Sequence, residues 1–350
     1  MGGSQAWRRK AMISAAVVLG LAVAGGGIAY GTGAYDEWQD GRSLSSACDG
    51  LLDGEQAKDL LGAERLRGKE AGWNGCTAFE PGRGKASMVV RVQQGSDSAR
   101  MLSQLARIET HWSGQLVGPV GGGWPAVISP RGYLAYAGAY LPCGKGPGDD
   151  LIVSIAAHRD ASVPSFDDRT QQTRLARIVT QTLTKAAEKQ GCELPDGADV
   201  SQAPDGTFKT LKRAAETKGT CRGTGSAGYE AAADGAAPIE DCLLADAQGK
   251  KLFRLAAYYG PYVKSARLET LRGKTYLGRS GGSQGVYWTT VSCPSGDALY
   301  AIEPLDDGER FATADPELER RALKVFAAGS AQRHGCGAVA DAPRKAGGGE

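Results

Sequence analysis

The chain has 350 residues and a formal net charge of +2, with acidic and basic residues interspersed along its length. It has neither a basic stripe nor a long acidic run, which argues against a nucleic-acid partner and against a solvating charged tail. Its cysteines number eight, and an even count favours an oxidising compartment over the cytoplasm.

The N-terminus indicates a membrane anchor. Residues 1–10 form a basic segment ending in Arg8, Arg9 and Lys10, and residues 11–31 contain no charged side chain. About 20 apolar residues suffice for a helix to cross the hydrocarbon core. The positive-inside rule then places the basic segment in the cytoplasm and exports the rest of the chain. The lipid bilayer is therefore a predicted partner, through residues 11–31.

A cleaved signal peptide is the competing interpretation. Ala22 and Ala24 match the small-residue pattern before a cleavage site, and cleavage near Ala24 would leave a secreted protein. The apolar run continues past that site through Ile28, and Tyr35 and Trp38 follow where interfacial aromatic side chains are found. We therefore favour a retained, single-pass anchor.

The length beyond the anchor, about 315 residues, suggests two domains. Segments rich in Pro, Gly and polar residues separate them. The expected order is a spacer at residues 32–46, an extracytoplasmic domain at 47–195, a linker at 196–212, a second extracytoplasmic domain at 213–337 and a disordered tail at 338–350.

Strands and helices are expected in the same order in both domains. In the first, strands at residues 88–92, 133–137 and 151–156 alternate with a helix at 99–108 and end in a closing helix between Asp168 and Gly191. The second has strands at 252–255, 286–291 and 298–302, a helix at 262–271 and a closing helix between Asp315 and Gly335. An acidic residue before each closing helix and a glycine after it are typical helix-end signals. The fold class is therefore α+β, with an antiparallel sheet in each domain covered on one side by helices, including a long C-terminal one.

The eight cysteines divide at the central linker into two quartets. They are Cys48, Cys76, Cys143 and Cys192, then Cys221, Cys242, Cys293 and Cys336. The gaps run short, long, intermediate in both quartets, and each quartet closes with Gly-Cys after a helix, which indicates an internal duplication.

The duplication limits how the cysteines can pair. If every disulfide lies within one domain and both domains pair their cysteines in the same way, three of about a hundred possible disulfide pairings remain. We favour first-to-second and third-to-fourth pairing, which gives Cys48–Cys76, Cys143–Cys192, Cys221–Cys242 and Cys293–Cys336. Zinc sites place cysteines in close pairs, which these gaps do not provide, so no metal or other cofactor is predicted.

Two short motifs resemble catalytic signatures. Residues 281–285 match G-x-S-x-G, which would make Ser283 the nucleophile of a serine hydrolase. That chemistry requires a helix after the serine, whereas the residues that follow are β-branched and aromatic, typical of a strand. Residues 223–228 match a dinucleotide fingerprint, but the residues before them are polar and we expect a loop there.

One segment carries a family resemblance. Cys48-Asp49-Gly50-Leu51-Leu52, with Ala57-Lys58-Asp59-Leu60-Leu61-Gly62 and Cys76, resembles uncharacterised exported or membrane-anchored proteins of actinobacteria. The resemblance implies small disulfide-bonded α+β domains and no known activity. The second copy lacks the Leu-Leu-Gly element, and residues 229–232 are expected to be its degenerate helix.

The function expected from the sequence is a binding or scaffolding module of the cell envelope rather than an enzyme. It would be a single-pass membrane protein whose partner is an envelope protein or ligand of unspecified chemistry. The alternative is an envelope serine hydrolase that uses Ser283.

Overall fold

The computed structural model describes residues 34–72, 74–82, 84–107, 116–144, 148–204, 210–268, 276, 278–283, 285–306 and 310–339. The predicted basic segment, the predicted anchor at 11–31 and most of the predicted tail lie outside these residues. Within them, no helix combines the length and the apolar character that crossing a membrane requires.

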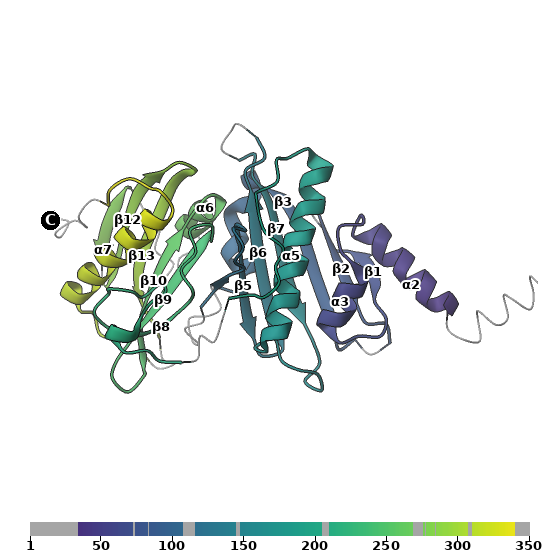
Figure 1. The fold of residues 1–350 in the computed structure, drawn as a ribbon, viewed down its shortest axis with the longest axis horizontal. Helices are drawn as coiled ribbons and strands as arrows, with labels where there is room; N and C mark the ends of the chain where they lie inside the picture. The colour runs from purple at the N-terminus through teal and green to yellow at the C-terminus, as the bar shows by residue number, and fades with distance from the viewer. Residues whose placement is uncertain are drawn as a thin grey trace, which may run out of the picture.

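Two antiparallel sheets form the core of the molecule (Figure 1). The first has the order β1 (Arg67–Glu70), β2 (Gly75–Phe79), β3 (Ser87–Gln94), β7 (Leu151–His158), β6 (Leu134–Leu141), β5 (Ala126–Arg131) and β4 (Gly118–Pro119). The second has the order β8 (Ala227–Glu230), β9 (Ile239–Ala245), β10 (Lys251–Tyr258), β13 (Gly296–Pro304), β12 (Val286–Cys293) and β11 (Ser280–Ser283). The predicted α+β class with antiparallel sheets is confirmed.

The strand order is the same in both sheets, except that the first sheet has one additional strand, β4, at its edge. In each sheet the first three strands along the chain lie side by side in sequence order, and the last strand of the repeat pairs with the third. The remaining strands follow the last one in reverse sequence order, toward the other edge of the sheet. We call residues 34–204, which build the first sheet and its helices, the first repeat. Residues 210–339 are the second repeat.

A long helix covers the outer face of each sheet. These are α5 (Arg169–Gln190) and α7 (Pro316–Arg333). The side chain of Asp168 accepts hydrogen bonds from the first turn of α5, and Asp315 caps α7 in the same way. The predicted apolar stripe of α5 is buried against the first sheet: Leu175, Ile178, Val179, Leu183 and Ala186.

All eight cysteines are bonded, in the predicted pattern. The bonds are Cys48–Cys76, Cys143–Cys192, Cys221–Cys242 and Cys293–Cys336. In each repeat the first bond ties the segment before the sheet to its second strand, and the second ties the end of a strand to the end of the long helix. Loops of these lengths stabilise a fold by about 3–4 kcal/mol each in the chain-entropy model.

The inner faces of the sheets pack toward each other, which the sequence did not indicate. Short helices that follow the third strand of each repeat meet between them: η1 (Gly95–Arg100) with α4 (Met101–Gln104), and α6 (Pro261–Leu268). One apolar cluster contains residues from both repeats, among them Met101, Leu105, Ile152, Tyr262 and Leu299. Each sheet is therefore covered by its long helix on the outer face and by the other repeat on the inner face, so the inner face is not left to solvent.

A buried ion pair joins the repeats at this interface. The guanidinium of Arg107 binds the carboxylate of Asp241, with 2.8 Å between Nη2 and Oδ1, and both side chains are almost fully excluded from solvent. Asp241 also accepts from the backbone N–H of Val117 at 3.0 Å, and Arg107 donates to the Tyr258 hydroxyl at 3.1 Å. Burial by itself would lower the pKa of Arg107, but Asp241 and Tyr258 raise it above its ordinary value.

Several expectations about local structure were wrong. Residues 34–46, expected in a loop-like spacer, belong to helix α2 (Ala34–Ala47). Its buried Asp40 accepts from Arg65 at 2.8 Å and from Arg67 at 2.7 Å, so the helix is held by tertiary contacts that its polar sequence does not reveal. Residues 229–232 are not a helix: Tyr229 and Glu230 belong to β8, which pairs with β9, and the next two residues have no regular secondary structure.

The predicted helix at 99–108 is shorter than expected. A 3₁₀ turn occupies Gly95–Arg100, and a single α-turn ends at Gln104. Ala106 adopts a left-handed φ of 52°, which ends the helix and directs the chain so that Arg107 reaches Asp241.

The first part of the predicted linker is packed rather than free. The indole N–H of Trp124 donates to the carbonyl of Ala198 at 2.8 Å, and Arg177 donates to the carbonyl of Val200 at 2.7 Å. Gly197 lies so close to Trp124 that a Cβ there would be 2.4 Å from the ring. The absence of a side chain at this position lets the segment lie on the first repeat.

A second buried polar cluster lies between β9 and α7. Glu240 accepts from Ser330 at 2.5 Å and from Arg333 at 2.7 Å, and its carboxylate lies 3.7 Å from His334. Burial alone would raise the pKa of Glu240, but hydrogen bonds and charge from His334, Arg333 and Ser330 lower it to about 2.

We predict that breaking the inter-repeat ion pair destabilises the fold strongly. Asp241→Asn removes the carboxylate charge that binds the buried Arg107 guanidinium and should lower the free energy of unfolding by about 3–5 kcal/mol. Replacing both residues, with Arg107→Met and Asp241→Leu, should recover most of this loss. Denaturant unfolding of the full chain measures the effect, with the exposed Glu64→Gln as control. A loss within 1 kcal/mol for Asp241→Asn would contradict the prediction.

Lowering the pH should reduce the stability of the second repeat, because it protonates the buried Glu240 carboxylate. Its pKa in the folded state lies below the ordinary 4.5, so the stabilisation is complete above pH 4.5 and is lost as the pH falls toward 2. The shift corresponds to about 3 kcal/mol. Glu240→Gln should remove this stabilisation at neutral pH and flatten the acid limb of the stability curve, measured by urea unfolding at a series of pH values. An unchanged acid limb in the variant would be the opposite result.

Candidate functional site

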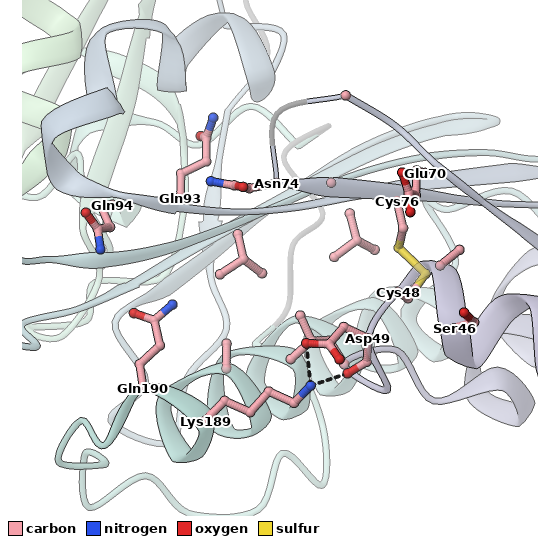
Figure 2. A pocket seen from close by; sticks show the side chains of 17 residues that line it. Ser46, Cys48, Asp49, Glu70, Asn74, Cys76, Gln93, Gln94, Lys189 and Gln190 are labelled. Atoms are coloured by element: carbon pink, nitrogen blue, oxygen red, sulfur yellow. Dashed lines mark hydrogen bonds and ion pairs between the residues drawn. A yellow bond between two sulfur atoms is a disulfide. The ribbon is translucent and has the colours of Figure 1, made fainter.

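An open cleft of about 800 Å³ lies in the first repeat (Figure 2). Its walls come from strands β1, β2 and β3, the C-terminal end of α5 and the segment that joins α2 to α3 (Gly54–Leu61). Its location at the meeting point of these elements makes it the candidate binding site.

The floor of the cleft is apolar. Val90 and Val92, at alternate positions of β3, and Ala186 of α5 line it. The Cys48–Cys76 disulfide closes one end. Because this bond joins the segment before the sheet to β2, it holds that wall of the cleft in place.

An ion pair forms the lower rim. Lys189, in the last turn of α5, pairs with the Asp49 carboxylate at 2.6 Å and also donates to the Asp49 carbonyl (Figure 2). Asp49 and Gly50 have left-handed φ values of 51° and 66°, so the chain turns sharply after Cys48 and meets the helix end. Exposed pairs of this kind add little stability. The effect of this one is to hold the Lys189 ammonium at the rim.

Amide side chains line the rest of the rim. Asn74, Gln94 and Gln190 border the cleft, and Gln93 accepts a hydrogen bond from Gln104 at 3.1 Å. Amides both donate and accept hydrogen bonds, so they match peptide groups or hydroxyls better than they match a strongly charged ligand.

The exposed carboxylate of Glu70 completes the lining. Glu70 ends β1 and lies opposite Cys76 in the β1–β2 register. Among the described residues, no side chain or backbone group forms a hydrogen bond or ion pair with its carboxylate. It is thus the one acidic group in the described lining that lacks a counter-charge, since Asp49 is paired with Lys189.

In the second repeat the turn that follows the first cysteine is packed differently. The turn after Cys221 lies directly against α7, and a Cβ on Gly223 would be 3.2 Å from Val325. In the first repeat the equivalent turn carries Asp49, whose contact with Lys189 lies at the edge of an open space instead. The two repeats share a fold but differ at this site.

The residues singled out in the sequence are distributed unevenly over the molecule. Cys48 and Cys76 line the cleft, whereas the other three disulfides lie elsewhere. Since all eight sulfurs are in disulfides, neither quartet can bind zinc as thiolates. Glu70, Asn74 and the three glutamines were not anticipated, because nothing in their spacing distinguishes them from other surface residues.

The two catalytic-looking motifs lie in the wrong structural context for catalysis. Ser283 ends β11 and pairs with Val286 of β12 across a tight hairpin, so a strand rather than a helix follows it. The strained strand-to-helix turn of a hydrolase nucleophile is therefore not formed there. Residues 223–226 form the expected turn, and β8 follows where a dinucleotide site would have a helix.

Comparison with known proteins identifies no relative. No protein-family model matches the chain, and no curated protein or solved structure matches it.

The hairpin position of Ser283 leads to a prediction. A serine-directed phosphonate probe should not label the full chain above the level of Ser283→Ala, since a nucleophile needs the exposed turn that the hairpin does not form. Labelling is measured by intact mass and gel fluorescence. Specific labelling that Ser283→Ala abolishes would restore the hydrolase hypothesis.

Proposed function

We propose that this chain is an extracytoplasmic binding module of the cell envelope, held at the membrane by residues 11–31. The cleft of the first repeat is its ligand site. The observation that carries the proposal is the cleft itself, which is open, is bordered by amide side chains and presents the Glu70 carboxylate, which has no hydrogen-bond or ion-pair partner among the described residues.

The disulfides support the extracytoplasmic location. Four bonds occur at equivalent places in the two repeats, and stable disulfides are rare in proteins kept in a reducing cytoplasm. A chain that needs them in both repeats is best suited to an oxidising compartment.

Helix α2 supports attachment to a membrane. Tyr35, Trp38 and Arg42 lie on the side of the helix opposite to the buried Asp40 and Leu44, and Trp38 is 57% exposed. Arg42 lies over the Trp38 ring at 5.3 Å. Aromatic and basic side chains are typical of the membrane interface, and this group begins four residues after the predicted anchor ends.

The position of α2 agrees with this attachment. It lies at one end of the long axis of the molecule, with α7 toward the other end (Figure 1). In the proposed arrangement the first repeat is close to the bilayer, and the second extends away from it.

The proposal is tested in intact cells with a benzophenone side chain placed at Gln94, on the cleft rim. The matched control carries it at Gln248, an exposed glutamine of the second repeat. We expect a discrete cross-linked species from position 94 that is absent from position 248. Equal cross-linking at both positions, or none at position 94, would refute a ligand site in the cleft.

Fractionation of the same cells tests the anchor separately. The chain should stay in the membrane fraction after alkaline carbonate extraction, because a spanning helix is not released by removing peripheral contacts. Release into the supernatant, together with a mature chain that begins near Ala24, would instead favour the secreted form.

A further inference from the structure

The two repeats place a glutamate at the same point of the sheet. Glu70 ends β1 opposite Cys76, and Glu230 ends β8 opposite Cys242. Each cysteine partner belongs to the first disulfide of its repeat. The register, and not the spacing along the chain, makes these two carboxylates equivalent.

In the second repeat this carboxylate binds a segment of the chain's own backbone. Glu230 accepts from the N–H groups of Lys218 at 2.9 Å, Gly219 at 2.8 Å and Cys221 at 3.3 Å. The ammonium of Lys212 pairs with it at 2.9 Å. The Glu230 side chain is only 1% exposed, so this is a fully occupied carboxylate site.

The bound segment lies tightly on the sheet. Gly219 approaches Ala231 so closely that a Cβ would be 2.1 Å from the Ala231 carbonyl oxygen. Thr220 donates its backbone N–H to the same carbonyl at 3.1 Å. The second repeat therefore shows how this site holds a peptide: by backbone N–H groups, a glycine and a lysine.

In the first repeat the equivalent segment lies elsewhere. The residues before Cys48 form α2, which is attached through Asp40 to Arg65 and Arg67 and through Ser43 to the N–H of Gly68. Glu70 consequently receives none of the hydrogen bonds that Glu230 receives, and it faces the open cleft.

We propose that the cleft binds an extended peptide segment of a partner protein, with a lysine or arginine and successive backbone N–H groups at Glu70. The binding would follow the pattern that residues 212–221 form with Glu230. This inference depends on the proposed function, since it names the ligand of the same cleft.

The rest of the cleft suits such a ligand. The apolar floor of Val90, Val92 and Ala186 accepts an aliphatic side chain, and the amides of Gln94 and Gln190 match peptide groups. With Asp49 already paired, the uncompensated charge of Glu70 selects a basic residue over an acidic one.

The test uses a peptide taken from the chain itself. A fluorescein-labelled copy of residues 210–221 carrying Cys221→Ser is titrated with the purified, disulfide-intact full chain, and binding is followed by fluorescence anisotropy. We expect saturable binding that Glu70→Gln weakens by roughly tenfold or more, as for the loss of a charge-assisted hydrogen bond. Glu64→Gln, an exposed glutamate of the same repeat outside the cleft, should bind as the wild type does.

A second peptide separates a direct contact from an indirect effect. Lys212→Ala in the peptide should weaken binding to the wild type but make little further difference to Glu70→Gln, because both changes remove the same ion pair. Circular dichroism checks that Glu70→Gln remains folded.

Absence of saturable binding, or equal binding by wild type and Glu70→Gln, would overturn the inference. If that result were accompanied by specific cross-linking at position 94, the cleft would bind a ligand of another class and the proposed function would stand. If cross-linking at position 94 were absent as well, the proposed function would also fall.

Discussion

The buried contact between Arg107 and Asp241 is the interaction on which the two-repeat arrangement depends. Each sheet has an apolar inner face that would be exposed in a separate repeat, and the interface covers both faces at once. Removing two opposite charges from water is costly, and the cost is offset here because the carboxylate also accepts from Val117 and the guanidinium also reaches Tyr258. The pair acts together with two further directional contacts between the repeats, in which the Leu102 N–H donates to Ser265 Oγ at 3.0 Å and the Lys264 ammonium donates to the Ser96 carbonyl at 2.7 Å.

The repeats are alike at this interface and different at the cleft. The short helices that follow the third strand of each repeat, η1 with α4 in the first and α6 in the second, meet between the two sheets. In the first repeat, the segment before Cys48 folded as α2 and left Glu70 uncovered; in the second, the segment before Cys221 lies along the sheet and covers Glu230. One register position thus supplies a structural contact in the second repeat and, in our proposal, a recognition group in the first.

Some features were predictable because local chemistry decides them. The long helices α5 and α7 begin at capping aspartates, contain an apolar stripe and are followed by a glycine with positive φ, and each of these signals lies within a few residues. The repeated order of the cysteines reduced the possible pairings to three, and the one favoured among them is the one observed. The G-x-S-x-G motif misled only when it was considered apart from its neighbours, because the β-branched residues after Ser283 already indicated a strand.

What the sequence determined by itself was the repeat, its long helices and its cross-links, since each is encoded by spacing or by end signals. Only the tertiary structure decided the cleft. Asp40 holds α2 through arginines about 25 residues away in the chain, and Glu70 and Glu230 become equivalent through strand register although their distances from the neighbouring cysteines differ. Contacts of this kind depend on which elements meet in space, and no local pattern of residue types records that.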